Sequence, residues 1–391
     1  MTVRTSTARR ITPAPTGPPL VVAAASHADV RRAILNARAL GLPLGVRATG
    51  HGTHVPLDGT VLVDTSPMAT VLVDADRSMA RVGAGAVWGD VAAAAAPFGL
   101  APLSGSHPDV GVTGYTLGGG LSWLSRRYGL AADSLVRAHL VTAAGSRLVA
   151  TEEENADLFW ALRGGGGGFG VVTSLEFRLH PVGRVYAGTS YFGIERAAAT
   201  FGRYREWIAG APDALSTAIL LTTRDDGRRV LAIRAMYDGD ATAAERLLRP
   251  LFEAAGPPLE EGMRSVPYAE AVMGGTPPRH VELFDDLPDP AIEAIRAADA
   301  PTVEIRHWGG AIGAPAPGTG PIGARATRLS VIADAHVPGL ATHATGGSFL
   351  NFLADTSRTA SAFTAADLRR LRAVKRAYDP ANLLRAGHTV Q

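Results

Sequence analysis

The first half of the chain contains a series of short apolar runs, and most of them end at a glycine, a proline or a charged residue. Runs of this length that contain β-branched residues are typical of strands. Between the first two runs, apolar residues recur at helical spacing over residues 30–40. Ser26 and Asp29 form a capping box before this stretch, and Gly41 follows it as a stop. The predicted strands are residues 19–23, 42–46, 60–64, 70–74, 79–82 and 169–179.

Two further local patterns stand in the first half. Residues 137–143 and 147–150 predict a β-hairpin with Ala144-Gly145 at its turn, and residues 156–163 predict a helix that Asn155 caps. Residues 100–120 show little periodicity but are too apolar for a free linker, so an ordered, glycine-lined loop is expected. Residues 121–128 predict a short helix.

After Pro181 the pattern changes to alternating apolar and polar positions with helical stretches between them. This mixture predicts an α+β arrangement with an antiparallel sheet. A last helix begins at Thr364 and Asp367, a second capping box, and its basic face is typical of a solvated surface. The predicted strands are 230–237, 303–308 and 327–333, and the predicted helices are 241–252, 290–298 and 364–378.

Composition removes several classes of function. The 391 residues are 46% hydrophobic and 19% charged, which indicates a globular chain, and the net charge of +2 without a long basic run gives no sign of nucleic acid as a partner. The absence of cysteine excludes disulfides, thiolate catalysis, Cys-ligated zinc and iron–sulfur clusters. No apolar run is long enough for a membrane span, and the N-terminal arginines are not followed by a signal-like apolar segment, so a cytoplasmic location is expected.

Three glycine-rich loops carry the candidate chemistry. They are RATGHGTHVPLD (47–58), SGSHPDVGVTGYTLGGG (104–120) and RGGGGGFG (163–170). Loops of this kind let backbone N–H groups approach an anionic ligand, and three of them predict one large, flat ligand, for which FAD is the best candidate. The stretch GAGAVWG (83–89) has the spacing GxGxxxG, so it does not match a dinucleotide-binding fingerprint.

Several long motifs together resemble the berberine bridge enzyme-like flavoproteins of the vanillyl-alcohol oxidase / p-cresol methylhydroxylase (PCMH) superfamily. The motifs are RATGHG (47–52), PDVGVTGYTLGGG (108–120), RRYGLAAD (126–133), DLFWALRGGGGGFGVVT (157–173), IRHWGGAI (305–312), NFLAD (351–355) and KRAYDPANLLR (375–385). The resemblance implies an α+β fold: a two-part FAD-binding domain of the PCMH type, and a substrate domain whose antiparallel sheet is flanked by helices. The expected division is a disordered tail (1–17), an FAD-binding domain (18–182), a substrate-binding domain (183–346) and a C-terminal segment that completes the FAD domain (347–391).

The resemblance also implies a cofactor site. His51 stands where the family links a histidine to the flavin 8α-methyl group, whereas a loop histidine that only hydrogen-bonds is the simpler interpretation of the residue alone. The second, cysteinyl link of many relatives is excluded because His107 occupies its position. Gly168 replaces a frequent asparagine. The implied cofactor residues are Arg47, Thr49, Gly50, His51, Gly52, His107, Val110, Gly111, Gly114, Tyr115, Gly167, Gly170, Val172, Asn351 and Asn382. A metal site at His51 and His54 is not supported by further ligands.

The catalytic base is not fixed by the motifs. Many bacterial relatives have a tyrosine after the residue that Asn351 matches, and this chain has Phe352, which cannot take a proton. The candidates are Tyr115 first, then His307 and Tyr237, with His107 also open. Each of them has a purely structural interpretation as a packed or hydrogen-bonded side chain.

The leading functional hypothesis is an FAD-dependent oxidoreductase that removes a hydride from a small organic substrate of the secondary-metabolite type, with O₂ reoxidising the flavin. The composition, rich in alanine, glycine and arginine, is typical of a high-GC bacterium. One alternative is a non-redox cyclase or lyase in which FAD is structural, and another is a binding protein for a flat metabolite. The sequence fixes neither the substrate nor the oligomeric state.

Overall fold

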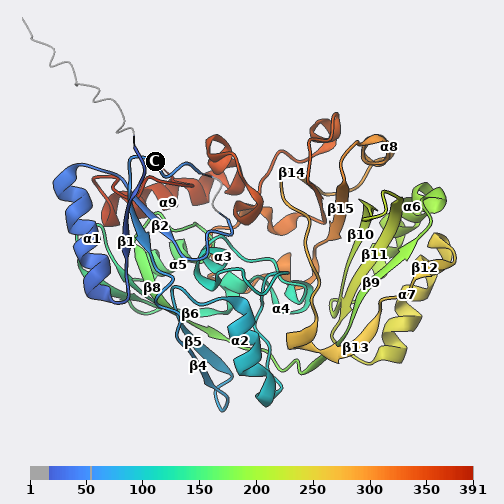
Figure 1. Ribbon diagram of the computed structural model, residues 1–391, viewed down its shortest axis with the longest axis horizontal. Helices are drawn as coiled ribbons and strands as arrows, with labels where there is room; N and C mark the ends of the chain where they lie inside the picture. The colour runs from blue at the N-terminus through green and yellow to red at the C-terminus, as the bar shows by residue number, and fades with distance from the viewer. Residues whose placement is uncertain (1–16, 53–54, 391) are drawn as a thin grey trace, which may run out of the picture.

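The computed structural model describes residues 17–52 and 55–390. Almost all of the predicted tail, and His54, therefore lie outside the described residues. The elements form two parts side by side, with the first sheets and α1 on one side and the largest sheet with α6 and α7 on the other (Figure 1). The fold is α+β, as predicted. Among the described residues no helix is both long and apolar enough to cross a membrane.

A small parallel sheet opens the fold. Its central strand is apolar up to Asp64, and the strand on each side pairs with it in parallel. Helix α1 connects these two outer strands, and its Val30, Ala33, Ile34 and Ala37 are completely buried. The predicted limits of α1 are confirmed, since the Ser26 hydroxyl accepts from the Asp29 amide and Gly41 ends the helix with φ +66°. The sheet order is β1 (Leu20–Ala23), β3 (Val61–Asp64) and β2 (Leu44–Arg47), and α1 is His27–Leu40.

A five-stranded antiparallel sheet follows. The predicted hairpin is confirmed, with Gly145 at φ +82° in its turn. Asn155 does not cap α5 as predicted: it has φ +51°, and its side chain donates to the Val149 carbonyl instead. The order is β4 (Val71–Asp74), β5 (Met79–Gly83), β8 (Val171–Arg178), β6 (Leu135–Val141) and β7 (Arg147–Ala150), with helices α2 (Trp88–Ala95), α3 (Val112–Leu117), α4 (Ser125–Tyr128) and α5 (Ala156–Leu162). The loop expected at 100–120 thus contains α3, and the helix expected at 121–128 is limited to α4.

The second part is built on an eight-stranded antiparallel sheet, and the predicted strands and helices of this region are confirmed within a few residues. The order is β12 (Pro258–Glu260), β9 (Arg184–Phe192), β11 (Arg229–Tyr237), β10 (Leu215–Thr223), β15 (Thr302–His307), β16 (Leu329–Ala333) and β14 (His280–Phe284), while β13 (Arg264–Pro267) also pairs with β9. The helices are α6 (Ala197–Trp207), α7 (Ala241–Ala255) and α8 (Asp289–Ala297).

The alternation along these strands sends successive side chains to opposite faces of the eight-stranded sheet. Ile219 and Ile305 face the core that includes residues of α6, α7 and α8. Ala218 and Leu220, their alternates, belong to the core that also contains residues of the five-stranded sheet, such as Phe177. The inner face of the large sheet therefore packs on the first part of the fold and is available to form a wall of a site between them.

The chain then returns to the first part through α9 (Ala365–Tyr378), which packs on α5 (Figure 1). Thr364 caps α9 through the Asp367 amide, as predicted. The chain passes from the five-stranded sheet to the eight-stranded sheet between β8, which ends at Arg178, and β9, which begins at Arg184. The domain limits at 182 and 346 stay predictions.

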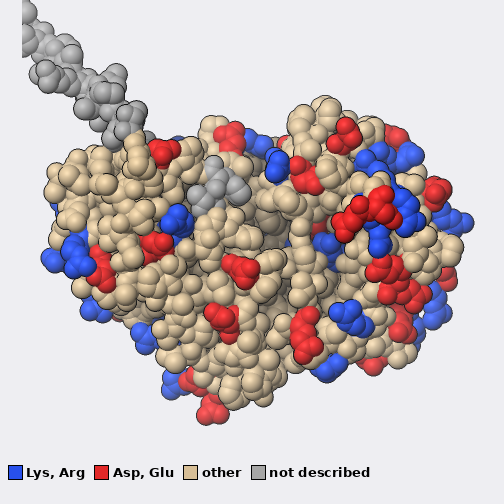
Figure 2. All heavy atoms as spheres, viewed as in Figure 1, with Lys and Arg blue, Asp and Glu red and all other residues tan. Residues whose placement is uncertain are grey.

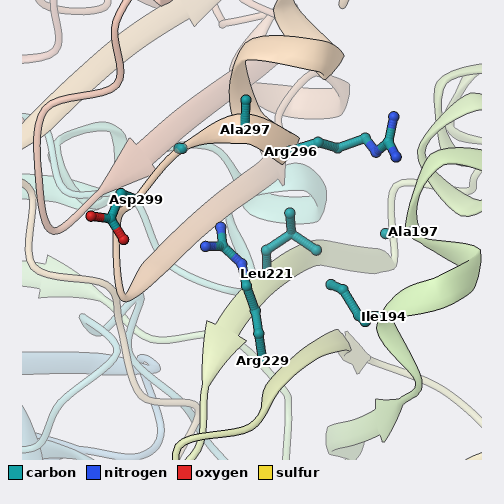
Figure 3. A pocket seen from close by; sticks show the side chains of 8 residues that line it. Ile194, Ala197, Leu221, Arg229, Arg296, Ala297 and Asp299 are labelled. Atoms are coloured by element: carbon teal, nitrogen blue, oxygen red, sulfur yellow. The ribbon is translucent and has the colours of Figure 1, made fainter.

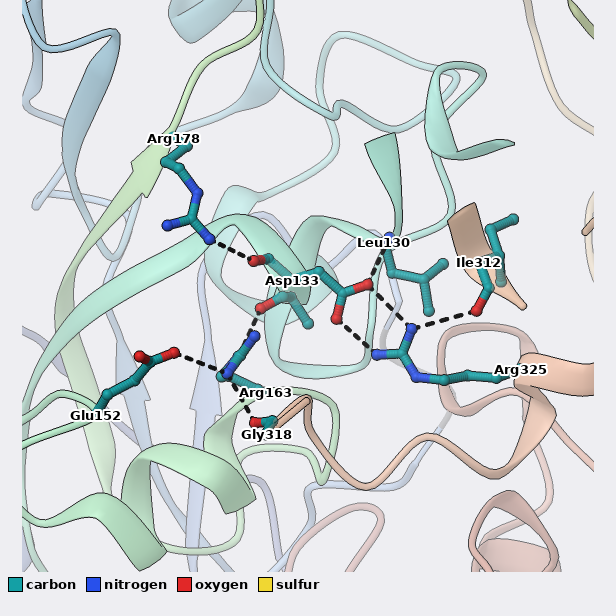
Figure 4. Close-up of polar contacts among 9 residues, drawn as sticks. Leu130, Asp133, Glu152, Arg163, Arg178, Ile312, Gly318 and Arg325 are labelled. Atoms are coloured by element: carbon teal, nitrogen blue, oxygen red, sulfur yellow. Dashed lines mark hydrogen bonds and ion pairs between the residues drawn. The ribbon is translucent and has the colours of Figure 1, made fainter. Parts of the chain in front are cut away.

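A buried polar network joins the two parts (Figure 4). The carboxylate of Asp133 accepts two hydrogen bonds from the Arg325 guanidinium, at 2.6 and 3.0 Å, and a third from the Leu130 amide. Arg163 donates to the carbonyls of Ala132 and Gly318, on opposite sides of the junction. Two-pronged arginine contacts of this type fix orientation as well as distance, so the network holds the two parts in one relative position.

On the face that Figure 2 shows, charged side chains of both signs gather over the part that carries the eight-stranded sheet and its helices, while much of the other part is uncharged. Positive and negative groups are interspersed there.

Candidate functional site

A cavity of about 760 Å³ lies between the glycine-rich loops and the inner face of the eight-stranded sheet. Its volume is in the upper part of the usual range for small-molecule sites, roughly 300–1,000 Å³. Every predicted cofactor residue except Asn382 lines it. The loops are far apart in sequence, and the fold brings them to one place. Among the described residues no group of three or more His, Asp or Glu side chains is placed to hold a metal ion.

Three predicted site residues do not line this cavity. His307 is 8% exposed, and its Nε2 lies 2.9 Å from Nη1 of Arg126, which ties it to the junction between the two parts. Tyr237 packs in a separate small core with Leu215 and Leu248. Asn382 has φ +50° in the turn after α9. The geometry therefore gives each of these three a structural place, and of the four candidates for the catalytic base Tyr115 and His107 line the cavity.

The glycines of the lining show that the loops leave room for a ligand. A Cβ atom on Gly52 or Gly114 would have no protein atom within 4 Å, and on Gly167 or Gly168 the nearest would be 3.9 Å away. These positions need no glycine for protein packing, so the space in front of them suits a ligand that approaches the backbone closely. The Thr113 hydroxyl is also buried beside the cavity, and no described residue is its hydrogen-bond partner. The cradle thus fits the large cofactor that the sequence predicts.

Two histidines share one wall of the cavity. The rings of His51 and His107 lie with their centroids 6.2 Å apart and are inclined by 26°. The backbone amide of His51 donates to the Thr49 hydroxyl, and the Asp109 amide donates to Nδ1 of His107. The Asp109 contact orients the His107 imidazole, and the two histidines lie side by side at the cavity.

Comparison with known proteins supports this assignment. Residues 18–151 match the family model described as an FAD binding domain. An FAD-linked oxidoreductase of Bacillus subtilis (strain 168), YgaK, is 29% identical over 94% of this chain and 90% of its own. (R)-6-hydroxynicotine oxidase of Paenarthrobacter nicotinovorans is 40% identical over 43% of this chain, and the match spans 37% of that enzyme. The crystal structure of 6-hydroxy-D-nicotine oxidase from Arthrobacter nicotinovorans superimposes with a TM-score of 0.83 at 25% identity, covering 96% of this chain and 92% of that one.

The chain belongs to the vanillyl-alcohol oxidase / p-cresol methylhydroxylase superfamily. The relatives that match it are FAD-linked oxidoreductases and oxidases, the class that its motifs predicted. Many of the relatives match over less than two thirds of their own length, so substrate and reaction are taken up below as proposals.

The cradle of this flavoprotein gives a direct test. Gly114 lies inside α3 and faces the cavity, so Gly114→Ala should leave the fold intact while its methyl group intrudes on the ligand space. We expect FAD binding to weaken by about tenfold or more, measured as flavin absorbance per protein. Gly202→Ala in α6, which also has no atom within 4 Å, is the matched control and should keep its flavin. Equal flavin content in both variants would contradict the assigned cradle.

The polyglycine loop of the flavoprotein is tied to the C-terminal segment by Lys375. Its ammonium group donates to the Gly168 carbonyl at 2.7 Å, to the Asp379 carboxylate at 2.7 Å and to the Leu384 carbonyl at 2.9 Å. Lys375 is 4% exposed, so the prediction of a wholly solvated basic face on this helix is wrong at this residue. Burial lowers the pKa of Lys375, and Asp379 opposes that shift.

Asn351 ties the second glycine-rich loop to the same segment. Its Oδ1 accepts from the Gly120 amide at 2.8 Å, and its Nδ2 donates to the Tyr115 carbonyl at 3.0 Å. A Cβ on Gly118 would lie 2.6 Å from Nδ2, so a glycine is required for this contact. Asn351 thus positions the loop that carries Tyr115.

The opposite wall comes from strand β15, where the sequence predictions assigned His307 to the site but not Glu304 or Arg306. Glu304 and Arg306 alternate with buried apolar residues and both line the cavity. Pro277, Pro278 and Ile332 complete this wall with apolar surface. The sequence signal was present: two charged residues alternate with Val303 and Ile305, which indicates that one face of the strand meets a polar site.

A second, smaller hollow of about 280 Å³ lies elsewhere, with side chains of Arg229, Arg296 and Asp299 around it (Figure 3). Its Leu221 belongs to the helix-covered face of the large sheet, opposite to the cavity. Arg296 is already paired with Glu293 on the surface of α8. The hollow therefore has no connection with the glycine-rich loops of the flavoprotein.

Proposed function

We propose that the protein is an oxidase that removes a hydride from a small organic substrate of the secondary-metabolite type, with FAD attached through His51 alone and O₂ as the electron acceptor. The observation that carries the proposal is the single cavity in which the predicted cofactor residues meet the inner face of the large sheet. A bacterial origin and a cytoplasmic location stay predictions.

Bound FAD supplies a two-electron acceptor with a planar reactive ring. The residues of this chain do the remaining work. The glycine-rich loops approach the ligand through their backbones, and Asn351 and Lys375 hold two of those loops in place. The apolar lining of the sheet wall, with Ile332 and Phe352, excludes water from the reacting groups.

Tyr115 is suited to donate a hydrogen bond to the substrate. Its hydroxyl oxygen is buried beside the cavity without a partner in the part of the chain that the structure describes, and its ring lies edge-on to Trp88, with the ring centroids 5.4 Å apart. Burial raises the pKa of Tyr115 well above its usual range, and the nearby charge of Arg306 acts against that shift. The phenol therefore keeps its proton at neutral pH, so we assign Tyr115 a role in holding a substrate heteroatom rather than in proton abstraction by the free enzyme.

Acid precipitation tests the attachment. In the wild type we expect the yellow colour to remain with the protein pellet, and in His51→Ala we expect all of it in the supernatant, because no other predicted link exists. The control His107→Ala should keep its flavin in the pellet, since the neighbouring ring is not the proposed attachment point. A wild-type protein that releases its flavin into the supernatant would contradict the covalent link.

A second candidate is a non-redox cyclase or lyase, which Phe352 favours because a phenyl ring lines the cavity next to Asn351 and cannot take a proton. Anaerobic addition of substrate separates the two functions. The oxidase should lose its visible flavin colour as the substrate is consumed, whereas the cyclase should form product with the colour unchanged.

A further inference from the structure

The guanidinium of Arg306 is buried and has no polar partner. Arg306 is 5% exposed and lines the cavity, yet among the described residues its side chain makes no hydrogen bond or ion pair, and its Nη2 is completely enclosed. A guanidinium offers five N–H donors. A buried charge without a partner costs several kcal/mol, so a group that supplies the partner is expected.

The neighbouring charges do not supply it. Glu304 lies two residues earlier on the same face of β15, but its carboxylate pairs with Arg234 at 3.4 Å and accepts from the Thr276 hydroxyl at 3.0 Å. In the sheet register, Ala218 of β10 lies between Arg234 on one side and Arg306 on the other. Two guanidinium groups thus face one carboxylate, which leaves an excess positive charge at Arg306.

The side chain is held in place for binding. The Arg306 guanidinium lies over the ring of Trp123, at 4.2 Å from its centroid, and the Trp123 indole donates to the Ser106 hydroxyl. Stacking of this type fixes the plane of the guanidinium. The Tyr115 hydroxyl is a second unpartnered donor on the same cavity, close enough for the Arg306 charge to act on it.

We infer that this wall is a carboxylate subsite, in which Arg306 binds an acidic substrate whose apolar body packs on Leu121, Ile332 and Phe352. A hydrogen bond from a charged guanidinium to a carboxylate is roughly twice as strong as one between neutral groups. The apolar lining around the charge selects an acid that is otherwise hydrophobic. The inference rests on the proposed function, because it names the class of substrate that the same cavity oxidises.

The test is calorimetric binding of two probes of similar shape to the FAD-loaded protein: phenylacetate, which carries the carboxylate, and neutral phenylacetamide. We expect wild type to bind phenylacetate about 10-fold to 100-fold more tightly, as charged hydrogen bonds of this type provide. Arg306→Met should bring the two affinities within about threefold. Arg229→Met, at the other hollow, removes an arginine whose Nη2 is also buried and unpartnered, and should keep the preference.

The thermal stability of the Arg306 variants distinguishes a role of Arg306 in binding from a role in holding the fold together. Because Arg306→Met removes an unpaired buried charge, its thermal midpoint should equal or exceed that of wild type. Arg306→Lys, which keeps the charge without the planar fork, should retain part of the preference and serves if the Met variant does not fold. A wild type without preference for phenylacetate, or a preference that survives in Arg306→Met, would overturn the inference.

The cofactor itself is the other source of a negatively charged oxygen. If FAD partners Arg306, the FAD-loaded wild type should show no preference between the probes, which also overturns the inference. A failure of this kind is distinct from a failure of the proposed function. A protein that takes up FAD and loses its colour with a substrate, but does not prefer phenylacetate, keeps the oxidase and loses only the carboxylate subsite.

Discussion

Lowering the pH from about 7.5 to about 5 should remove about 4 kcal/mol of the free energy of unfolding, because two buried histidines stay neutral in the folded protein. Burial, together with the charges of Arg126 and Arg328, lowers the pKa of His307 from 6.5 to about 2. Burial and the charge of Arg178 lower the pKa of His180 from 6.5 to about 4. In both places the protonated imidazole is less stable than the neutral one, because it is buried and lies near positive charges.

Stability falls with falling pH because the unfolded chain binds protons at a higher pH than the folded protein does. Below pH 6.5 the two histidines take up protons in the unfolded chain but not in the folded one. Their contribution is therefore complete above 6.5 and is lost as the pH falls from 6.5 towards the folded-state pKa values. At about pH 5 each histidine costs about 2 kcal/mol, which is about 1.5 pH units at 1.36 kcal/mol per unit. Carboxylates with lowered pKa values, such as Asp64, lose their contribution only below this window.

Urea unfolding at both pH values measures this loss. His307→Gln should reduce the pH-dependent loss by about 2 kcal/mol, because one of the groups that stay neutral in the folded protein is gone. His343→Gln replaces an exposed histidine and should leave the loss unchanged. Equal stability of the wild type at the two pH values would show that these rings are not held neutral.

Most of the secondary structure could be predicted because its signals are local. The capping boxes at Ser26 and Thr364 place their donors and acceptors within three residues, and Gly41 ends α1 by its own φ. The predicted cap at Asn155 was wrong because its side chain donates instead to the Val149 carbonyl of the adjoining strand β7. Local patterns cannot show such competition.

The cavity wall that the glycine-rich loops form was also predictable, because each loop is continuous in sequence. The opposite wall, on β15, was not. Arg306 and His307 are neighbours on β15, and successive side chains of a strand point to opposite faces. Only the packing of the sheet on the first part of the fold decides which of the two meets the cavity. The choice of His307 as a site residue was one position away from the residue that lines it.

Lys375 could have been recognised by its residue type. It is the single lysine of the chain, in which all other basic residues are arginines. It follows Leu371 by four residues, so it lies on the buried stripe of α9 together with Val374. A lone lysine on an apolar stripe indicates a required point charge, which an arginine could not fit in the same space.

Replacement of Lys375 by methionine should cost about 3–5 kcal/mol of the free energy of unfolding. The change leaves the Asp379 carboxylate, which is also buried, without its cation, although the amides of Leu383 and Leu384 still donate to it. It also removes the donor that the Gly168 carbonyl uses. We therefore expect the polyglycine loop to loosen and the purified variant to carry less flavin than the wild type.

Two further variants identify the cause of this loss. Arg376→Met removes an exposed cation one residue later on α9 and should be close to neutral, which separates the buried contact from the charge of the helix. The double variant Lys375→Met, Asp379→Leu removes both charges and should recover part of the stability, because an unpaired buried ion costs more than an absent pair. If the double variant recovers stability but still carries little flavin, the loss of flavin is caused by the missing hydrogen bond to the Gly168 carbonyl. A single variant as stable as the wild type would contradict the role of Lys375 as the link between the polyglycine loop and the C-terminal segment.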